Sequence, residues 1–159
     1  MIRIIGTWKM SSQGVGEACG LLQKGGSAGD AVVHAVARVE DEPAFTSVGY
    51  GGLPDAEGRL RTDAAFMDGG TLPVGGVMSA ENIKNPIKAA RLLCGRPTNC
   101  LLAGEGAAQF AIRQGLEMRD MRTEASLRRW REAQAKRAQP GAYTGHDTVC
   151  VLADRKSVV

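Results

Sequence analysis

Residues 61–80, with the sequence RTDAAFMDGGTLPVGGVMSA, contain the clearest fold signal in this 159-residue chain. Two short runs that contain apolar residues lie on either side of Gly69-Gly70. Tight hairpin turns need positive φ angles, which glycine adopts without steric cost, so two such runs around a glycine pair are typical of a β-hairpin. The stretch therefore predicts two antiparallel strands.

The segments before the hairpin predict a strand followed by two helices. Residues 27–40 give the clearest helix signal, because Ser27 is a favourable N-cap and Asp30, three residues later, completes an approximate capping box. The apolar positions of this helix recur at helical spacing: Val32, Val33, Val36 and Val39. Residues 14–24 show the same spacing, and residues 3–7 predict a short strand.

The segments after the hairpin alternate between helices and strands. We expect a helix over residues 84–95, a strand over 98–104 and a second helix over 105–115. Residues 123–138 predict a polar helix, and its basic side chains favour a solvated surface over RNA binding because no aromatic stacking platform accompanies them. Residues 149–152 predict a buried strand. This order indicates an α/β layered domain, with few strands for two helical layers.

Composition argues against several classes of protein. A net charge of +3 is too small to indicate a nucleic-acid or membrane partner, and no run approaches the ~18 apolar residues of a membrane span. The four cysteines form no C-x-x-C pair and only two histidines could join them, so we expect buried free thiols and no zinc site. We also expect no cofactor. The start, MIRIIGTW, is too short and polar for a signal peptide, which favours a cytoplasmic protein. A lost leader to the periplasm or lysosome is the alternative.

The triplet His146-Asp147-Thr148 is the sharpest chemical signal. A threonine hydroxyl becomes an effective nucleophile when a base takes its proton, and an N-terminal threonine supplies that base as its own α-amine. In the intact chain the Thr148 nitrogen is an amide. The amine is freed if the Thr148 hydroxyl attacks the Asp147 carbonyl and the resulting ester is hydrolysed. The triplet alone is common, so this chemistry depends on context.

Longer motifs supply that context: GTWKM, GGSAGDAV, VEDEPAFTSVGYGGLPDAEGRLRTDAAFMDG, IKNPIKAARLL, LLAGEGAAQFA and GHDTV. In this order they resemble the α-chain of glycosylasparaginase, in the N-terminal-nucleophile hydrolase family that also includes the plant-type asparaginases. The resemblance implies a four-layer αββα sandwich, of which the N-terminal portion is present. Residues 1–147 would be the α-chain part of the hydrolase domain, and residues 148–153 the start of the β-chain.

Position by position, the resemblance implies roles for four residues. Thr148 matches the nucleophile, and Asp147 matches the residue before the self-cleaved bond. Ser47 matches a serine that supports the nucleophile, and Trp8 matches a tryptophan that lines the substrate pocket. The plant-type enzymes usually lack this tryptophan and show Gly-Thr at the junction, so Trp8 together with His146-Asp147-Thr148 favours the glycosylasparaginase branch. The β-chain's substrate-gripping Arg and Asp and its Thr-Gly oxyanion hole are missing, because 11 residues follow Thr148.

The activity implied by the resemblance is that of an amidohydrolase. It would convert N4-(β-N-acetylglucosaminyl)-L-asparagine to aspartate and a glycosylamine, with the β-chain and a second αβ unit in a homodimer as partners. A plant-type L-asparaginase or isoaspartyl dipeptidase is the alternative within the class. A non-catalytic α-chain-like domain that binds a partner through unpaired sheet edges is the alternative outside it. The truncated chain itself is expected to be inactive.

Residues 154–159, DRKSVV, differ from the family's continuation, which usually runs through an Asp-x-x-Gly turn into a second strand. Their sequence is the translation of a widely used short-read sequencing adapter. We therefore expect a non-native tail, with a natural exposed tail as the alternative.

Overall fold

The computed structural model describes residues 1–136 and 148–155, so Asp147, His146 and residues 156–159 lie outside the described residues. The helices and strands follow the order expected from the sequence, with one additional short 3-10 helix, η1. Their bounds are β1 Ile2–Gly6, η1 Lys9–Ser11, α1 Ser12–Gln23, α2 Ala28–Glu40, β2 Arg61–Met67, β3 Val74–Glu81, α3 Pro86–Leu93, β4 Leu101–Ala103, α4 Gly104–Arg113, α5 Glu124–Lys136 and β5 Val151–Arg155. Strand β5 thus includes Asp154 and Arg155, the first two residues of the expected tail.

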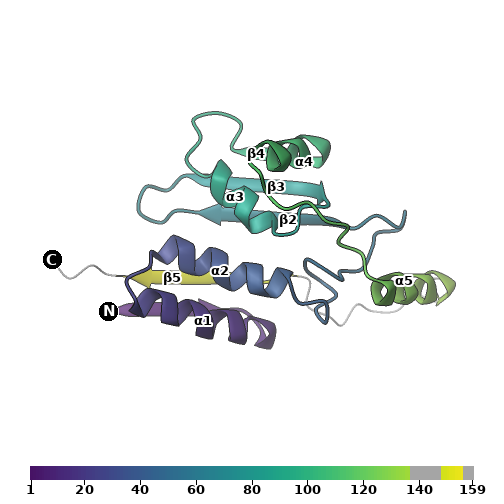
Figure 1. Ribbon diagram of the computed structural model, residues 1–159, viewed down its shortest axis with the longest axis horizontal. Helices are drawn as coiled ribbons and strands as arrows, with labels where there is room; N and C mark the ends of the chain where they lie inside the picture. The colour runs from purple at the N-terminus through teal and green to yellow at the C-terminus, as the bar shows by residue number, and fades with distance from the viewer. Residues whose placement is uncertain (137–147, 156–159) are drawn as a thin grey trace.

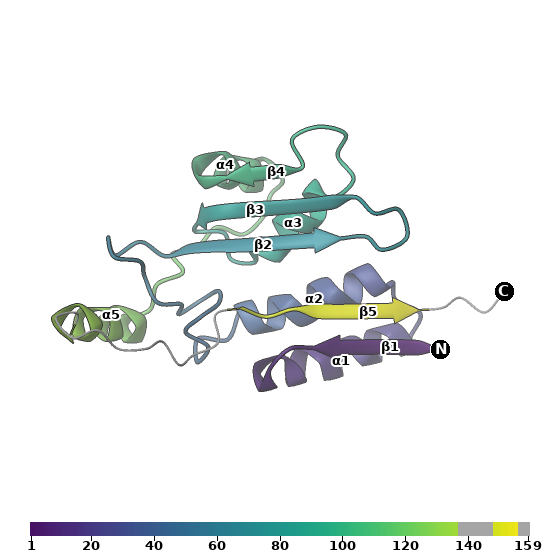
Figure 2. The ribbon, with the colours of Figure 1, turned by 180° about the vertical axis from the view of Figure 1, so that it is seen from behind.

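The strands form two separate sheets that lie side by side (Figures 1 and 2). β1 and β5 pair antiparallel, with Ile2 opposite Arg155 and Gly6 opposite Val151. β2 and β3 form the predicted antiparallel hairpin, and β4 joins β3 in parallel. Helices α1 and α2 cover one face of the first sheet, and α3 and α4 cover the same side of the second (Figure 1). The described part is therefore one helical layer on one sheet layer, which confirms the α/β class.

Helix α2 begins where its capping signal predicts. Ser27 Oγ accepts a hydrogen bond from the Asp30 N–H at 3.0 Å, which satisfies one of the free N–H groups of the first turn. The buried face is built largely from small residues: Ala31, Ala35, Val36, Ala37 and Val39. Because these side chains are small, α1 packs so closely that a Cβ on Gly14 would overlap the Ala35 backbone.

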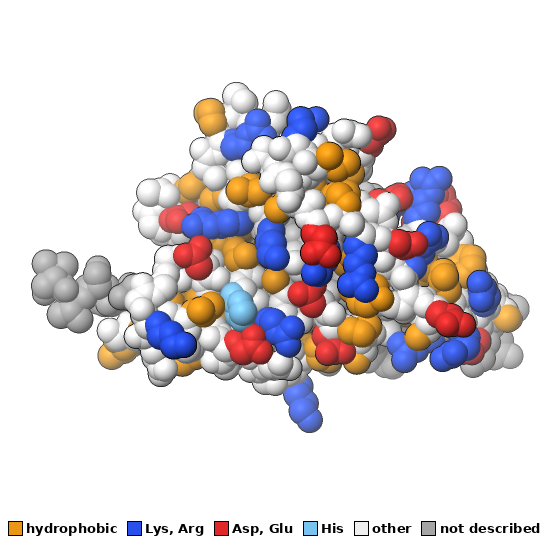
Figure 3. Space-filling model, in the orientation of Figure 1, with side chains coloured by type: hydrophobic (Ala, Val, Ile, Leu, Met, Phe, Trp, Pro, Cys, Tyr) orange, Lys and Arg blue, Asp and Glu red, His pale blue; other side chains and the backbone are white. Residues whose placement is uncertain are grey.

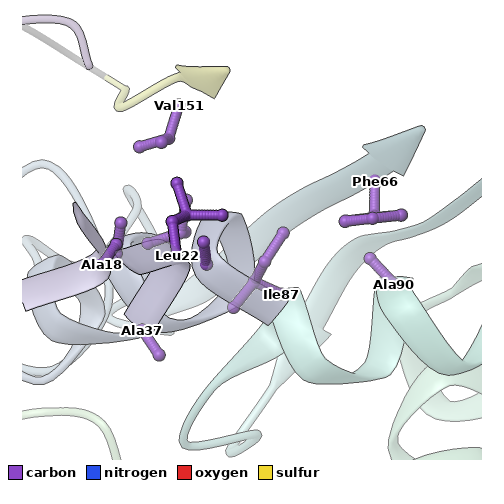
Figure 4. Packing of buried hydrophobic residues seen from close by; sticks show 10 residues of the cluster. Ala18, Leu22, Ala37, Phe66, Ile87, Ala90 and Val151 are labelled. Carbon is purple, nitrogen blue, oxygen red and sulfur yellow. The ribbon is translucent and has the colours of Figure 1, made fainter. Parts of the chain in front are cut away.

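A packed core joins the two sheets on the helical side. Figure 4 shows Val151 of β5 and Leu22 of α1 in the same cluster as Ile87 of α3 and Phe66 of β2. Helices α2 and α3 also contact each other directly. The helical layer is therefore continuous, although the sheet layer is interrupted between β5 and β2.

The sheet faces opposite the helices expose apolar side chains. Ile5 and Leu152, which lie opposite each other on β1 and β5, are 67% and 65% exposed. The second sheet exposes Met67, Val74, Met78 and Leu101. The prediction of a buried strand over residues 149–152 is therefore wrong in part. Val151 is buried against the helices, but Cys150 and Leu152 lie on the bare face because successive side chains alternate across a strand.

The cysteines are free, as expected, but the prediction that they are buried is wrong. Cys150 is exposed for the reason just given, and the other three are partly buried: Cys19, Cys94 and Cys100. Among them, Cys94 packs against the core, and its thiol donates a hydrogen bond to the Pro73 carbonyl at 3.4 Å.

Helix α5 lies at one end of the molecule and is anchored by its tryptophan (Figure 1). Trp130 Nε1 donates a hydrogen bond of 2.7 Å to the Asp55 carbonyl, and its ring packs over Gly58. Its basic residues Arg128, Arg129 and Arg131 are all exposed. Positive and negative side chains are interspersed over the helical face of the molecule as a whole (Figure 3).

Candidate active site

A cavity of about 790 Å³ lies between β5 and β2. Its walls come from α2, the loop over residues 41–60, strands β2 and β3, the start of α3 and residues 148–151. Thr148 and Ser47, two of the predicted site residues, both line this cavity although they are far apart in the sequence. The tertiary structure therefore brings the predicted nucleophile and its predicted supporting serine to one place.

Thr148 lies three residues before β5 and is exposed. Two hydrogen bonds fix the backbone beside it. The Thr7 N–H donates to the Cys150 carbonyl at 2.9 Å, and the Cys150 N–H donates to Thr7 Oγ1 at 2.8 Å. The approach to β5 is therefore tied to the end of β1, which restricts where Thr148 can lie.

The loop that carries Ser47 is held in a tight conformation. The Tyr50 N–H donates to the Glu40 carbonyl at 2.7 Å, and the Leu53 N–H donates to the Thr46 carbonyl at 2.8 Å. Gly49 has φ 56°, and a Cβ at this position would overlap the Glu40 backbone. Ser47 is half-buried within this turn. Residues 48–52, VGYGG, therefore form a tight backbone turn.

Trp8 lies two residues after the end of β1 and is not among the described residues that line the cavity. It follows Thr7 directly, has φ 60° and is 50% exposed. Its carbonyl accepts hydrogen bonds from the Ser11 hydroxyl (2.9 Å) and N–H (3.1 Å). Within residues 1–136 and 148–155, Trp8 is not among those that line the cavity, so its substrate-binding role stays a prediction.

Glu40 is a cavity residue that our sequence analysis did not single out. It is 4% exposed, and its Oε1 accepts a hydrogen bond from the Ile87 N–H at 3.1 Å. Burial raises the pKa of Glu40 to about 8, so the carboxyl is largely protonated at neutral pH. Its Oε2 has no hydrogen-bond partner among the described residues. One signal could have found it, because Glu40 follows Val32 and Val36 at four-residue spacing and so falls on the same helical face.

The charged residues of the β2 wall interact mainly with each other. Arg61 forms an ion pair with Asp55 at 2.8 Å and also pairs with Glu57 and Glu81. Hydrogen bonds from the backbone N–H groups of Arg59 and Glu57 lower the pKa of the Asp55 carboxyl. Asp63 Oδ1 accepts a hydrogen bond of 2.6 Å from the Ser79 N–H. These ion pairs and hydrogen bonds therefore stabilise the β2 side of the cavity.

The described residues that line the cavity offer hydroxyl groups and two carboxyl groups, those of Glu40 and Asp63. Histidine, the residue that most often activates a hydroxyl, does not occur among the described residues that line the cavity. Residues 1–136 and 148–155 contain no group of three or more His, Cys, Asp or Glu residues placed to hold a metal ion. None of the described helices is both long and apolar enough to cross a membrane.

Comparisons with known proteins place this geometry in context. Residues 7–154 match the family model described as Asparaginase. The N(4)-(β-N-acetylglucosaminyl)-L-asparaginase of Elizabethkingia miricola is 38% identical over 152 residues, which cover 94% of this chain and 44% of that protein. The plant-type L-asparaginase of Thermococcus kodakarensis is 42% identical over 118 residues, covering 74% of this chain and 38% of that protein.

A third relative has a printed name that combines two activities. The isoaspartyl peptidase/L-asparaginase of Homo sapiens is 44% identical over 97 residues, which cover 61% of this chain and 31% of that protein. The chain therefore spans less than half the length of each of these relatives.

Proposed function

The chain belongs to the asparaginase family that its residues 7–154 match, and from this premise we propose that the protein is an amidohydrolase acting on the side-chain amide of an asparagine derivative. The cavity shared by Thr148 and Ser47 carries the proposal. Both residues line this one cavity, Thr148 from the approach to β5 and Ser47 from the loop after α2, which supports their assignment as nucleophile and supporting hydroxyl.

The nucleophile is formed by cleavage of the chain before Thr148. The Thr148 hydroxyl attacks the Asp147 carbonyl carbon, the peptide nitrogen takes up a proton, and an ester replaces the peptide bond. Water then hydrolyses the ester, leaving the Asp147 carboxylate and a free Thr148 amine. The freed Thr148 amine then lies on the same residue as the hydroxyl, so the nucleophile carries its own base.

In the substrate reaction the Thr148 amine acts first as a base and then as an acid. The Thr148 amine takes the hydroxyl proton as the oxygen attacks the side-chain amide carbon, and it passes this proton to the leaving nitrogen as the C–N bond breaks. Water then hydrolyses the acyl-enzyme ester and releases aspartate. Ser47 supports Thr148 by hydrogen bonding, and Trp8 contacts the substrate. No cofactor takes part.

Glycosylasparagine is the proposed substrate, with aspartate and a glycosylamine as products. The Elizabethkingia miricola relative, whose printed name states this activity, covers more of the chain than the plant-type and isoaspartyl relatives do. L-asparagine or isoaspartyl dipeptides are the second candidate, supported by those other relatives. A non-catalytic domain that binds a partner is the third, and the exposed apolar sheet faces favour it.

The whole enzyme is larger than the described part. We propose that residues 1–147 are its α-chain portion, that residues 148–153 begin its β-chain, and that residues 154–159 are a tail. The β-chain completes a four-layer αββα sandwich, and two αβ units form a homodimer. The bare faces of both sheets, which expose residues such as Ile5 and Leu152, are where the second pair of layers would pack.

Two measurements test the proposal. Intact-mass spectrometry of the purified chain should show a break before Thr148 if self-cleavage survives here, with Thr148→Ala as the uncleaved control. For activity, residues 1–153 are fused to the remaining β-chain portion of the Elizabethkingia miricola relative and assayed for aspartate release. Turnover of the glycosylated substrate above asparagine, lost in Thr148→Ala and reduced in Ser47→Ala, is expected. Unchanged turnover in Thr148→Ala would refute the mechanism.

A further inference from the structure

We propose that Glu40 is a positioning residue of the active site, whose carboxyl group donates a hydrogen bond from Oε2 to the Ser47 hydroxyl, directly or through one water. This bond leaves the proton of the Ser47 hydroxyl free to point toward Thr148. The role of Thr148 rests on the proposed function, whereas the link between Glu40 and Ser47 does not.

The Glu40 carboxyl has one oxygen that is hydrogen-bonded and one that is not. Oε1 accepts the Ile87 N–H at 3.1 Å, whereas Oε2 is buried and has no hydrogen-bond partner among the described residues. Burial raises the pKa of Glu40 to about 8, so at neutral pH the group is largely uncharged and carries one proton. That proton belongs on Oε2, because Oε1 already acts as an acceptor. Oε2 is therefore a buried donor, and leaving such a donor without an acceptor is costly.

The loop that carries Ser47 lies directly against Glu40. The Tyr50 N–H donates to the Glu40 carbonyl at 2.7 Å, and the Gly49 backbone is so close that an added Cβ would overlap Glu40 Cα. Ser47 precedes Gly49 by two residues and lines the same cavity as Glu40. Within residues 1–136 and 148–155, the Ser47 hydroxyl has no hydrogen-bond partner. An unpaired donor and an unpaired hydroxyl therefore share one cavity.

Other side chains of the cavity wall are weaker candidates for the acceptor. Thr62 and Asp63 of β2 also line the cavity, but each is already bonded to β3, through hydrogen bonds of 3.2 and 2.6 Å. Thr46 lies in the same loop as Ser47 and also lines the cavity. Its hydroxyl is the natural comparison for Ser47, because both side chains sit on the loop that packs on Glu40.

The direction of the hydrogen bond depends on the charge of Glu40. The charged and polar groups that face Glu40 come from the end of α2, the start of α3 and β2: Asp41, Asn85, Lys88, Arg61 and Asp63. Burial has the largest effect and favours the neutral form, as does Asp41, whereas Asn85 and Lys88 favour the ionised form. When Glu40 ionises, Oε2 becomes an acceptor and takes the Ser47 proton, which turns that proton away from Thr148. Activity should therefore fall as Glu40 ionises.

NMR titration of the ¹³C-glutamate-labelled chain tests the link without any activity. Glu40→Gln identifies the Glu40 carboxyl signal, whose pH dependence gives the ionisation constant of this group. A hydroxyl binds a carboxylate more strongly than a neutral acid, so Ser47→Ala should lower the ionisation constant of Glu40 by at least about threefold. Thr46→Val removes the neighbouring hydroxyl of the same loop and should change this constant by less than about twofold.

Kinetics of the fused enzyme described above test the positioning role. Glu40→Gln keeps a neutral donor toward Ser47, whereas Glu40→Met has a similar length and no donor. We expect Glu40→Gln to keep kcat within about threefold and to lose the alkaline fall in kcat, and Glu40→Met to lower kcat by at least about tenfold with KM nearly unchanged. Glu132→Gln, at an exposed position, should keep the pH profile of the parent. Urea denaturation of each variant separates these effects from lost stability.

Three results would overturn the proposal: an unchanged Glu40 ionisation constant in Ser47→Ala, an equal change in Thr46→Val, or equal kcat in Glu40→Gln and Glu40→Met. If Ser47→Ala does not fold, the new side-chain amide of Glu40→Gln decides. Its protons should show a nuclear Overhauser contact with the Ser47 β-protons, and the lack of this contact would overturn the link. A shifted Glu40 titration in Ser47→Ala with an inactive fused enzyme leaves the link standing and counts against the proposed function instead.

Discussion

Thr7 and Cys150, 143 positions apart in the chain, bind each other through two hydrogen bonds in which each N–H donates to the other residue. This pair ties the end of β1 to the approach to β5. Trp8 follows Thr7, and Thr148 precedes Cys150 by two residues, so this long-range contact joins the two segments that carry these predicted site residues. The Thr7 hydroxyl therefore has a structural role close to the proposed nucleophile.

Replacing Thr7 by valine tests this link. Thr7→Val keeps the shape of the side chain but removes the oxygen that accepts the Cys150 N–H, so the free energy of unfolding should fall by about 1 kcal/mol. Thr7→Ser retains the acceptor and should lose less. Urea denaturation measures both, and equal stability of the serine and valine variants would show that the hydroxyl contributes nothing.

Gly49 should not tolerate a side chain. Its φ of 56° disfavours other residues, and an added Cβ would overlap the Glu40 backbone. Gly49→Ala should therefore lower the free energy of unfolding by about 2 kcal/mol or more and disturb the turn that carries Ser47. Gly16→Ala in α1 is the control, because an added Cβ there meets open space and should stabilise the helix by up to about 1 kcal/mol.

Because of Glu40, the free energy of unfolding should fall as pH rises, whereas most carboxylates make it rise. Burial raises its pKa from 4.5 to about 8 in the folded state. Below pH 4.5 the carboxyl is protonated in both states, whereas between 4.5 and about 8 it ionises only on unfolding. The free energy of unfolding should therefore fall as pH rises through this window, by at most about 1.4 kcal/mol per pH unit.

Glu40→Gln should remove this decline, because the amide stays neutral and can still accept the Ile87 N–H. The variant should match the parent near pH 4.5 and exceed its stability near pH 8 in urea denaturation. Glu132→Gln, at an exposed position, should leave the pH profile of the parent unchanged. Parallel profiles for the parent and Glu40→Gln would mean that Glu40 is ionised in the folded state.

Trp130 should decide whether α5 stays docked. Trp130→Phe keeps a ring over Gly58 but loses the hydrogen bond to the Asp55 carbonyl, which should cost about 1 kcal/mol of local stability. Trypsin should then cut α5 faster at its exposed Arg128 and Arg129. Arg131→Ala changes an exposed neighbour and should not alter cleavage at those two sites, so equal acceleration in both variants would contradict anchoring by the tryptophan.

Short-range patterns in the sequence predicted each element that forms from neighbouring residues. The Ser27 cap, the hairpin around Gly69-Gly70 and the helix that begins at Pro86 all appear where local hydrogen bonding and backbone geometry place them. Burial was predicted less well. Cys150 and Leu152 looked like core residues because the run 149–152 is apolar, but their faces depend on which side of the strand the helices cover.

The sequence alone determined the order and type of the elements and, through its motifs, the family and the candidate nucleophile Thr148. Only the tertiary structure decided that Thr148 and Ser47 share a cavity, that Glu40 is buried there with a raised pKa, and that the sheet is split between β5 and β2. Helix caps and turns depend on residues within a few positions of each other. Cavities, desolvated carboxyls and strand neighbours depend on contacts between segments far apart in the chain, and the packing of α2 against α3 sets those contacts.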